Sequence, residues 1–314
     1  MNQTFARFVL IGLSTDPYVQ PLIFIIFLLI YTVTILGNVL IIIVVRIGIH
    51  LQTPMYFFLS NLSFIDLFFS TSVVPKLLIN TLSEDKSISF LGCVAQMYFT
   101  LALGGTECLI LAIMGYDRYV AICNPLHYNT IMSLRICVII STGIWVFNFS
   151  NSMFYAVITF QLPYCKSNDV NHYFCEMPPL FHLSCKDTLM EKIAVYISGS
   201  IVGLCAFVLT LLSYAQIIFT ILKIRSTTGQ KKAFSTCTSH ICVISLYYGS
   251  IVFMYLRPRG SYSVEKDRAV AIFYTVITPM FNPIIYSIRN NEVKGTMKKL
   301  LKKELQTSVI KIRI

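Results

Sequence analysis

Long apolar stretches separated by short polar connectors dominate the chain. Seven of them reach the length of about 20 residues that an α-helix needs to cross a bilayer; they lie at 22–45, 55–79, 94–116, 136–159, 193–222, 233–256 and 269–288. A β-barrel is excluded, because its strands would alternate polar and apolar residues over about ten positions. The sequence shows no repeat and no linker. The pattern predicts one domain (1–314), an all-α membrane protein built as a bundle of seven transmembrane helices.

The composition supports lipid as the main solvent. Of 314 residues, 56% are hydrophobic and 12% are charged, whereas soluble domains carry about 25% charged residues. So little polar surface cannot cover a globule in water, and such hydrophobicity is not typical of disorder. The net charge of +11 suits either a nucleic acid or a membrane surface. Because the basic residues fringe the apolar spans, we predict a lipid bilayer and no nucleic acid as partner.

The charges also predict an orientation. If residues 1–21 lie outside, the inner loops and the tail 289–314 hold 15 Lys and Arg against 3 acids, and the outer segments hold 10 against 9. An excess of Lys and Arg marks the cytoplasmic side. We therefore expect a multi-pass plasma membrane protein with an extracellular N-terminus, where Asn2-Gln3-Thr4 is an N-glycosylation acceptor.

Four cysteines fall on the predicted outer side, at Cys93, Cys165, Cys175 and Cys185. Oxidising conditions favour disulfides there, and four cysteines allow three pairings. His172 and His182 each precede a cysteine by three positions, which is also a plausible zinc spacing. Disulfides would consume the thiolates that zinc needs. We prefer a loop crossed by two disulfides, which would form a rigid lid.

Two acids and two amides fall at one depth near the bilayer midplane. Asp66 and Glu107 each lie about 16 Å from the predicted cytosolic edge at 1.5 Å per residue, with Asn38 and Asn282 close to that level. One interpretation is a cation site for Na⁺ or a shared proton, because adjacent carboxylates cannot both stay ionised unaided. The other is a hydrogen-bond network that only packs the helices. Pro283 beside Asn282 predicts a flexible kink, and so a candidate switch.

The inner end of the third span reads MGYDRYVAICNPL over 114–126. This resembles the signature of rhodopsin-like G-protein-coupled receptors, in the long form typical of odorant receptors. The proline-bearing start of the outer segment resembles that of class II odorant receptors, the tetrapod type. Four further blocks agree in order and spacing: Gly37-Asn38, PMYFFLSNL over 54–62, KAFSTC through His240 over 232–240, and PMFNPIIY over 279–286.

The resemblance implies a switch at the cytosolic side. Asp117 would pair with Arg118 in the inactive state, and activation would free Arg118 for the G protein; a snorkelling anchor is the alternative for this arginine. The resemblance also implies the pairs Cys93–Cys175 and Cys165–Cys185. The implied coupling residues are Asp117, Arg118, Tyr119, Tyr214, Lys232, His240, Asn282, Pro283 and Tyr286.

Family positions carried onto this chain outline a small neutral pocket. Its residues are Thr100, Leu101, Gly104, Gly105, Cys108, Ser198, Gly199, Val202, Tyr248, Ile251, Val252, Tyr255, Ile272 and Thr275. Such a cavity suits a neutral volatile or sparingly soluble odorant, held by burial and one or two hydrogen bonds. Gly104 and Gly105 either widen the cavity or permit close helix contact.

The resemblance further implies a stimulatory olfactory-type G protein that raises cAMP, an export chaperone, olfactory cilia as the location, and no cofactor beyond the alternative of Na⁺. An apolar stripe through Val293, Met297, Leu300 and Leu301, flanked by lysines, predicts a short amphipathic eighth helix on the inner leaflet. A chemosensory receptor outside olfaction and a membrane transporter are the alternative functions. An enzyme is not expected, since no nucleophile–base pair or HExxH motif is visible.

Overall fold

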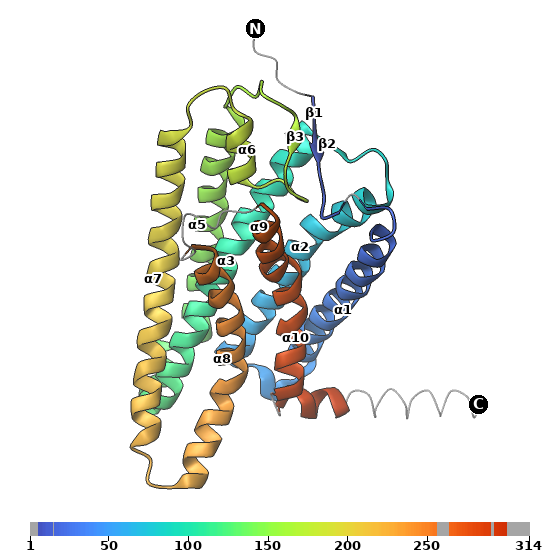
Figure 1. Cartoon of the computed structure of the whole chain (residues 1–314). Helices are drawn as coiled ribbons and strands as arrows, with labels where there is room; N and C mark the ends of the chain where they lie inside the picture. The colour runs from blue at the N-terminus through green and yellow to red at the C-terminus, as the bar shows by residue number, and fades with distance from the viewer. Residues whose placement is uncertain (1–5, 15, 256–263, 290–291, 300–314) are drawn as a thin grey trace, which may run out of the picture.

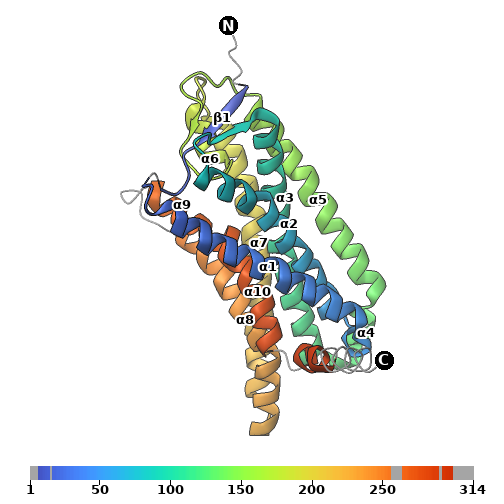
Figure 2. The ribbon, with the colours of Figure 1, turned by 90° about the vertical axis from the view of Figure 1, so that its right-hand side faces the viewer.

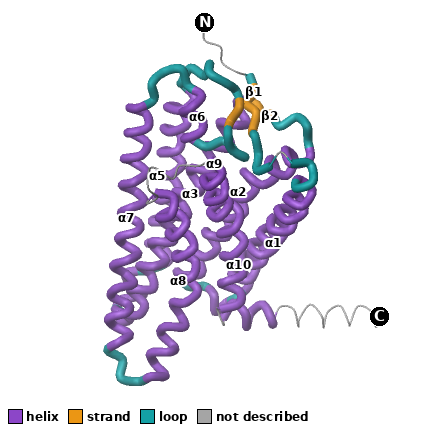
Figure 3. The backbone as a smooth tube through the Cα atoms, viewed as in Figure 1, coloured by secondary structure: helices purple, strands orange, loops and turns teal. Residues whose placement is uncertain are grey.

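The structure is a bundle of long helices with a small β-sheet at one end. It is a computed structural model that describes residues 6–14, 16–255, 264–289 and 292–299. Figure 3 shows the strands only at the end near the N-terminus, which we call the lid end. The opposite end, which carries Asp117, is called the Asp117 end. The largely helical fold predicted from the apolar stretches is confirmed.

The helices begin where prolines and capping side chains allow. Pro54 opens the second long helix, and Ser89 and Ser133 cap the next two by accepting hydrogen bonds from the backbone N–H groups of Gly92 and Ile136, as N-caps commonly do. The long helices are α1 (Gln20–Ile47), α2 (Pro54–Leu82), α3 (Phe90–Cys123), α5 (Leu134–Phe160), α7 (Leu189–Leu222) and α8 (Thr227–Tyr255). Short elements between them are η1 (Ile49–Leu51), η2 (Pro125–His127), α4 (Tyr128–Ile131) and α6 (Met177–Leu183).

Six segments of the described residues are helical, long enough and apolar enough to cross a membrane. They are α1, α2, α3, α5, α7 and the segment Asp267–Ser287. Large side chains on their outer faces are exposed; Leu36 is 65% and Leu212 is 61% exposed. Apolar side chains in such numbers on the outside of a bundle suit a lipid environment. α8 lies between α7 and α10 in Figure 1 and contacts α10.

The last long segment is interrupted in a way that the sequence did not predict. α9 (Val264–Ile272) passes into a π-helical turn, η4 (Phe273–Ile277), before α10 (Thr278–Arg289) begins. The Thr278 hydroxyl donates to the Phe273 carbonyl at 3.0 Å and so stabilises this turn. Pro283, where we expected a kink, lies inside α10. The π-helical turn thus adds an irregularity closer to the lid end than Pro283.

The lid end combines three short strands and two disulfides. β1 (Arg7–Leu10) lies between β2 (Ser87–Ser89) and β3 (Asp169–Val170), antiparallel to β2 and parallel to β3. Disulfides join Cys93 to Cys175 and Cys165 to Cys185, with Cα–Cα separations of 5.5 and 5.8 Å. The N-terminal segment is thus part of the lid, with Phe8 and Leu10 completely buried in it.

Residues 292–299 form a further helix that lies across the Asp117 end of the bundle, as the turned view in Figure 2 shows. Val293 from its apolar stripe is completely buried in the main core. The Tyr56 hydroxyl donates to Oε2 of Glu292 at 2.7 Å and ties this helix to α2. Leu300 and Leu301 of the predicted stripe lie outside the described residues. The described part already shows how an apolar face anchors the segment.

Candidate ligand pocket and activation switch

The two buried acids meet across three helices. Asp66 of α2 and Glu107 of α3 are 0% and 1% exposed. The Asn282 amide of α10 donates to Oδ2 of Asp66 at 2.9 Å and interacts with Glu107 as well. Three of the four residues predicted at the midplane are therefore in contact. A single amide links both carboxyl groups to the helix that carries Pro283.

Asn38, the fourth of these residues, holds α1 against the same region. Its amide donates to the carbonyls of Thr34, at 2.9 Å, and Pro279, at 3.0 Å. Gly37 explains how the helices come so close, because a Cβ atom there would lie 2.9 Å from the Pro283 ring. The resemblance placed Gly37-Asn38 and Pro283 in separate blocks, and the structure joins them into one contact.

Unpartnered oxygens make this cluster chemically suited to a hard cation. One oxygen each of Asp66, Glu107, Asn38 and Asn282 is buried and has no hydrogen-bond partner among the described residues. Hard cations prefer oxygen ligands of this carboxylate and amide type. No group of three or more His, Cys, Asp or Glu side chains gathers anywhere in the described part of the chain. The donor set therefore fits Na⁺ or a proton better than a transition metal.

The Asp117 end departs from the expected ion pair. Oδ1 of Asp117 accepts a hydrogen bond at 2.8 Å from the hydroxyl of Tyr128, at the start of α4. Within the described residues, no ion pair joins Asp117 to Arg118, and the Arg118 Nε is buried with no hydrogen-bond partner. In this structure the hydrogen-bond partner of the Asp117 carboxylate is therefore Tyr128 of the neighbouring loop.

Other predicted switch residues gather close by. The Tyr214 hydroxyl of α7 and Nδ1 of His240 of α8 are 2.6 Å apart, and both side chains are buried. Tyr286 of α10 is 1% exposed, and its hydroxyl has no partner among the described residues. Tyr119 packs on both neighbouring core clusters. The Lys232 side chain lies outside the described residues.

In the middle of the bundle, Tyr248 is the polar centre of the predicted pocket. Its hydroxyl lies 3.4 Å from the Cys108 carbonyl oxygen, 3.9 Å from the Cys108 Sγ and 3.5 Å from the Thr210 hydroxyl. All three distances are long for strong hydrogen bonds, so this hydroxyl is weakly held. Cys108 follows Glu107 directly in α3. The residue that contacts the Tyr248 hydroxyl is therefore the direct neighbour of Glu107 in the sequence.

Other polar groups of the predicted pocket are already engaged. Thr100 donates to the Gln96 carbonyl of its own helix, at 2.9 Å. Ser198 and Tyr155 share a 2.7 Å hydrogen bond between α7 and α5. The Thr275 hydroxyl lies 2.9 Å from that of Tyr173 in the lid. Leu101 packs against the apolar cluster of the lid, and Ile272 packs against the cluster that contains Tyr173.

The glycines differ in what they do. A Cβ atom at Gly105 would collide with Asn148 of α5, so this position permits close packing of α3 on α5, the second of the two alternatives. The Gly104 carbonyl accepts a hydrogen bond from Tyr247 at 2.9 Å. On α7, Gly199 is exposed and Val202, another residue of the predicted pocket, is half-buried. The side chains of Ile251, Val252 and Tyr255 lie outside the described residues.

The disulfides decide against zinc in the outer loop. Cys175 and Cys185, which followed the two histidines at zinc spacing, both form disulfide bonds. Their sulfurs are therefore not available as thiolates. Asn2, the predicted glycosylation site, lies outside the described residues.

The sequence analysis missed a titratable cluster in the lid. His172 is 3% exposed, and its Nε2 lies 3.7 Å from Oε2 of Glu176, whose Oε1 accepts a hydrogen bond from Tyr274 at 3.0 Å. Burial lowers the pKa of His172 to about 3 and raises the pKa of Glu176 to about 7. Glu176 and Tyr274 lie 98 positions apart, so their contact could not be predicted from the sequence. The only local signal was the spacing of His172 and Glu176, four positions apart in HYFCE.

Comparisons with known proteins identify the family of this chain. A family profile described as "Olfactory receptor" matches residues 27–304. The chain is 49% identical to the olfactory receptor-like protein OLF3 of the dog over 96% of this chain and 95% of the relative. The chain belongs to the olfactory receptor family. Olfactory receptor 5AP2 of the mouse is 47% identical, covering 94% and 93%, and human olfactory receptor 5B21 is 47% identical, covering 95% and 96%.

Family membership establishes the general function. This olfactory receptor is an odorant receptor and not an enzyme. Its apolar helices fit a multi-pass membrane protein.

Proposed function

We propose that this receptor spans the membrane seven times, with α8 as a further span and the lid end outside, and that it binds a small neutral odorant beneath the lid. Tyr248 carries the proposal, because it is a weakly held hydroxyl at the centre of the bundle. An odorant could take over its hydrogen bond at little cost. Among the described side chains of the predicted pocket none is charged, and the nearest buried acid is Glu107, which precedes Cys108 in α3; this favours a neutral ligand.

A path for the signal follows from the contacts. An odorant beside Tyr248 and Cys108 would act on α8 and on the neighbouring Glu107, which Asn282 connects to α10. Movement of α8 would break the Tyr214–His240 hydrogen bond at the Asp117 end and open a cavity for the G protein beside Arg118. We infer that the G protein is of the stimulatory olfactory type and that cAMP rises.

Two further roles belong to the same proposal. The oxygens of Asp66, Glu107, Asn38 and Asn282 would hold Na⁺ or share a proton in the resting state, which keeps α1, α2, α3 and α10 together. Residues 292–299 would form the start of an eighth helix on the inner leaflet, where their lysines face anionic lipid. We also expect glycosylation at Asn2, export with a chaperone, and a location in olfactory cilia.

An odorant panel tests the proposed function directly. Cells that express the receptor with an export chaperone and a stimulatory olfactory G protein should raise cAMP with at least one neutral odorant. Arg118→Ala should abolish the response while surface expression, measured by flow cytometry, remains. Ion current or uptake without G protein would instead support a transporter.

The pocket has its own test. Tyr248→Phe removes only the hydroxyl and should shift the odorant dose response about five- to tenfold to higher concentration, since a net hydrogen bond contributes about 1 kcal/mol. Tyr116→Phe is the control, because its hydroxyl makes no hydrogen bond within the described part of the chain. Equal curves for the two variants would place the odorant elsewhere.

A further inference from the structure

Asn80, near the lid end of α2, is a buried amide whose polar atoms are both unpartnered. Its side chain is 3% exposed, and neither Oδ1 nor Nδ2 has a hydrogen-bond partner among the described residues. Buried polar groups in folded proteins are nearly always hydrogen-bonded. An occupant of the space that this amide lines could supply the missing partner.

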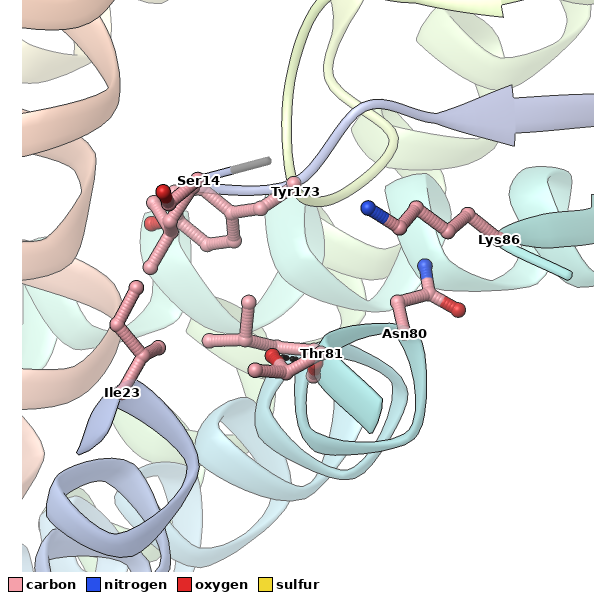
Figure 4. Close-up of a pocket in the computed structure, with 9 residues that line it drawn as sticks. Ser14, Ile23, Asn80, Thr81, Lys86 and Tyr173 are labelled. Atoms are coloured by element: carbon pink, nitrogen blue, oxygen red, sulfur yellow. Dashed lines mark hydrogen bonds between the residues drawn. The ribbon is translucent and has the colours of Figure 1, made fainter. Parts of the chain in front are cut away.

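Asn80 lines a small cavity beneath the lid, drawn in Figure 4. The cavity has a volume of about 10 Å³. That is room for about one occupant of the size of a water molecule. The walls come from the N-terminal segment, α1, α2 and both loops of the lid, including Ser14, Ile23, Thr81, Lys86 and Tyr173. The cavity can therefore hold one occupant of atomic size.

Lys86 brings a positive charge to this cavity. It is half-buried, and its ammonium group makes no hydrogen bond or ion pair with any described residue. Its carbonyl accepts a hydrogen bond from the Leu10 N–H at 3.0 Å, which fixes the lysine backbone to β1. Figure 4 shows the Lys86 amine and the Asn80 amide nitrogen on the same side of the cavity. Two nitrogen donors thus face one small space.

The walls do not neutralise this charge. No carboxylate lines the cavity within the described residues. Asp85, the neighbour of Lys86, instead pairs with Arg7 at 3.9 Å and accepts the Ser87 N–H at 2.9 Å. The Thr81 hydroxyl is used by the Leu77 carbonyl at 2.7 Å. The cavity therefore offers hydrogen-bond donors and a positive charge but no described acceptor for them.

We propose that this cavity binds one small anion, chloride in size, between Nδ2 of Asn80 and the ammonium group of Lys86. A cation is disfavoured by Lys86, and a carboxylate or phosphate group is too large for the space. A water molecule could satisfy the buried Asn80 amide, but it would bring no negative charge to the half-buried Lys86 ammonium group. The bound anion would join α2 to the N-terminal segment and to the two loops of the lid that contain Lys86 and Tyr173, and so stabilise the lid.

Thermal stability of the purified receptor in lipid nanodiscs tests the proposal. At equal ionic strength, sodium chloride should raise the Tm of the wild type over that in sodium gluconate by about 3 °C, with saturation. Sodium bromide should act similarly, because bromide is also a monatomic anion. Asn80→Leu and Lys86→Met should each lose this shift. Lys166→Met, which removes the same charge from an exposed position on the lid, should keep it.

Three results would overturn the proposal. One is an equal Tm of the wild type in chloride and gluconate, which would indicate a buried water only. Another is a rise with chloride that never saturates, which would indicate general salt effects. The third is a chloride shift retained in Asn80→Leu. The wild-type curve decides the first two even if a variant fails to fold.

Discussion

The two ends of this receptor are held together by different kinds of interaction. At the lid end, two disulfides and a three-stranded sheet connect segments far apart in the sequence. At the Asp117 end, single side-chain hydrogen bonds such as Tyr128–Asp117 and Tyr214–His240 connect the helices. Each net hydrogen bond contributes only about 1 kcal/mol, and a disulfide about 2–4 kcal/mol. The difference suits a rigid receiving end and an end that can open.

The largest expected effect breaks the lid. Cys93→Ser combined with Cys175→Ser should remove most receptor from the cell surface, since losing such a disulfide costs about 2–5 kcal/mol. Surface labelling of an N-terminal epitope measures this. The matched comparison is Cys165→Ser combined with Cys185→Ser. This disulfide closes a loop of 20 residues instead of 82, so its loss should lower the free energy of unfolding by about 1 kcal/mol less. Full surface levels in the first variant would refute the rigid lid.

A smaller effect is expected at the opposite end. Tyr128→Phe releases Asp117, which can then pair with Arg118 and hold the receptor in its resting state. The odorant concentration for half-maximal cAMP should rise about fivefold, as expected for about 1 kcal/mol, while surface expression stays constant. A rise in cAMP without odorant would contradict this, because it would mean that the Tyr128 hydroxyl itself keeps the receptor at rest.

The smallest expected effect is the pH dependence of stability that His172 and Glu176 give to the lid end. His172, with a pKa lowered to about 3, makes the unfolded state bind more protons, so it raises stability as pH rises from about 3 to 6.5. Glu176, with a pKa raised to about 7, makes the folded state bind more protons, so it lowers stability as pH rises from about 4.5 to 7. Between about 4.5 and 6.5 the two slopes oppose each other.

Single substitutions should separate these opposing slopes. The Tm of Glu176→Gln should rise with pH between 4.5 and 6.5, because only the histidine effect remains. The Tm of His172→Phe should fall over the same range, and the wild type should be nearly flat. Parallel curves for all three proteins would show that this cluster is not the source of the pH dependence.

Local pattern was enough to predict the helices, but not what joins them. Apolar stretches of about 20 residues locate the long helices because burial in lipid demands that length. The sheet escaped prediction because its strands have four residues or fewer, and Val9 pairs with Asp169, about 160 positions away. The π-helical turn at Phe273–Ile277 has no residue signal comparable to the proline at Pro283.

The site shows the same division. Equal depth brought Asp66, Glu107 and Asn282 together in the prediction, because depth follows from counting along helices. The direction of Gly105 toward Asn148 depends on the rotation of the helix about its axis, which a stretch that is apolar on all sides does not specify. The bond between Tyr128 and Asp117 depends on how a short loop folds back on α3, and that is a tertiary property.

The position of β1 has a consequence for how the chain is made. This strand leaves the ribosome first, yet its partner β3 begins at Asp169. At about 5–20 residues per second, roughly 10–30 s of synthesis separate the two. During that interval β1 cannot pair with β3, and the apolar side chains of Phe8 and Leu10 stay uncovered. Chaperones of the secretory compartment would meet the nascent receptor at this segment before any other part of the lid.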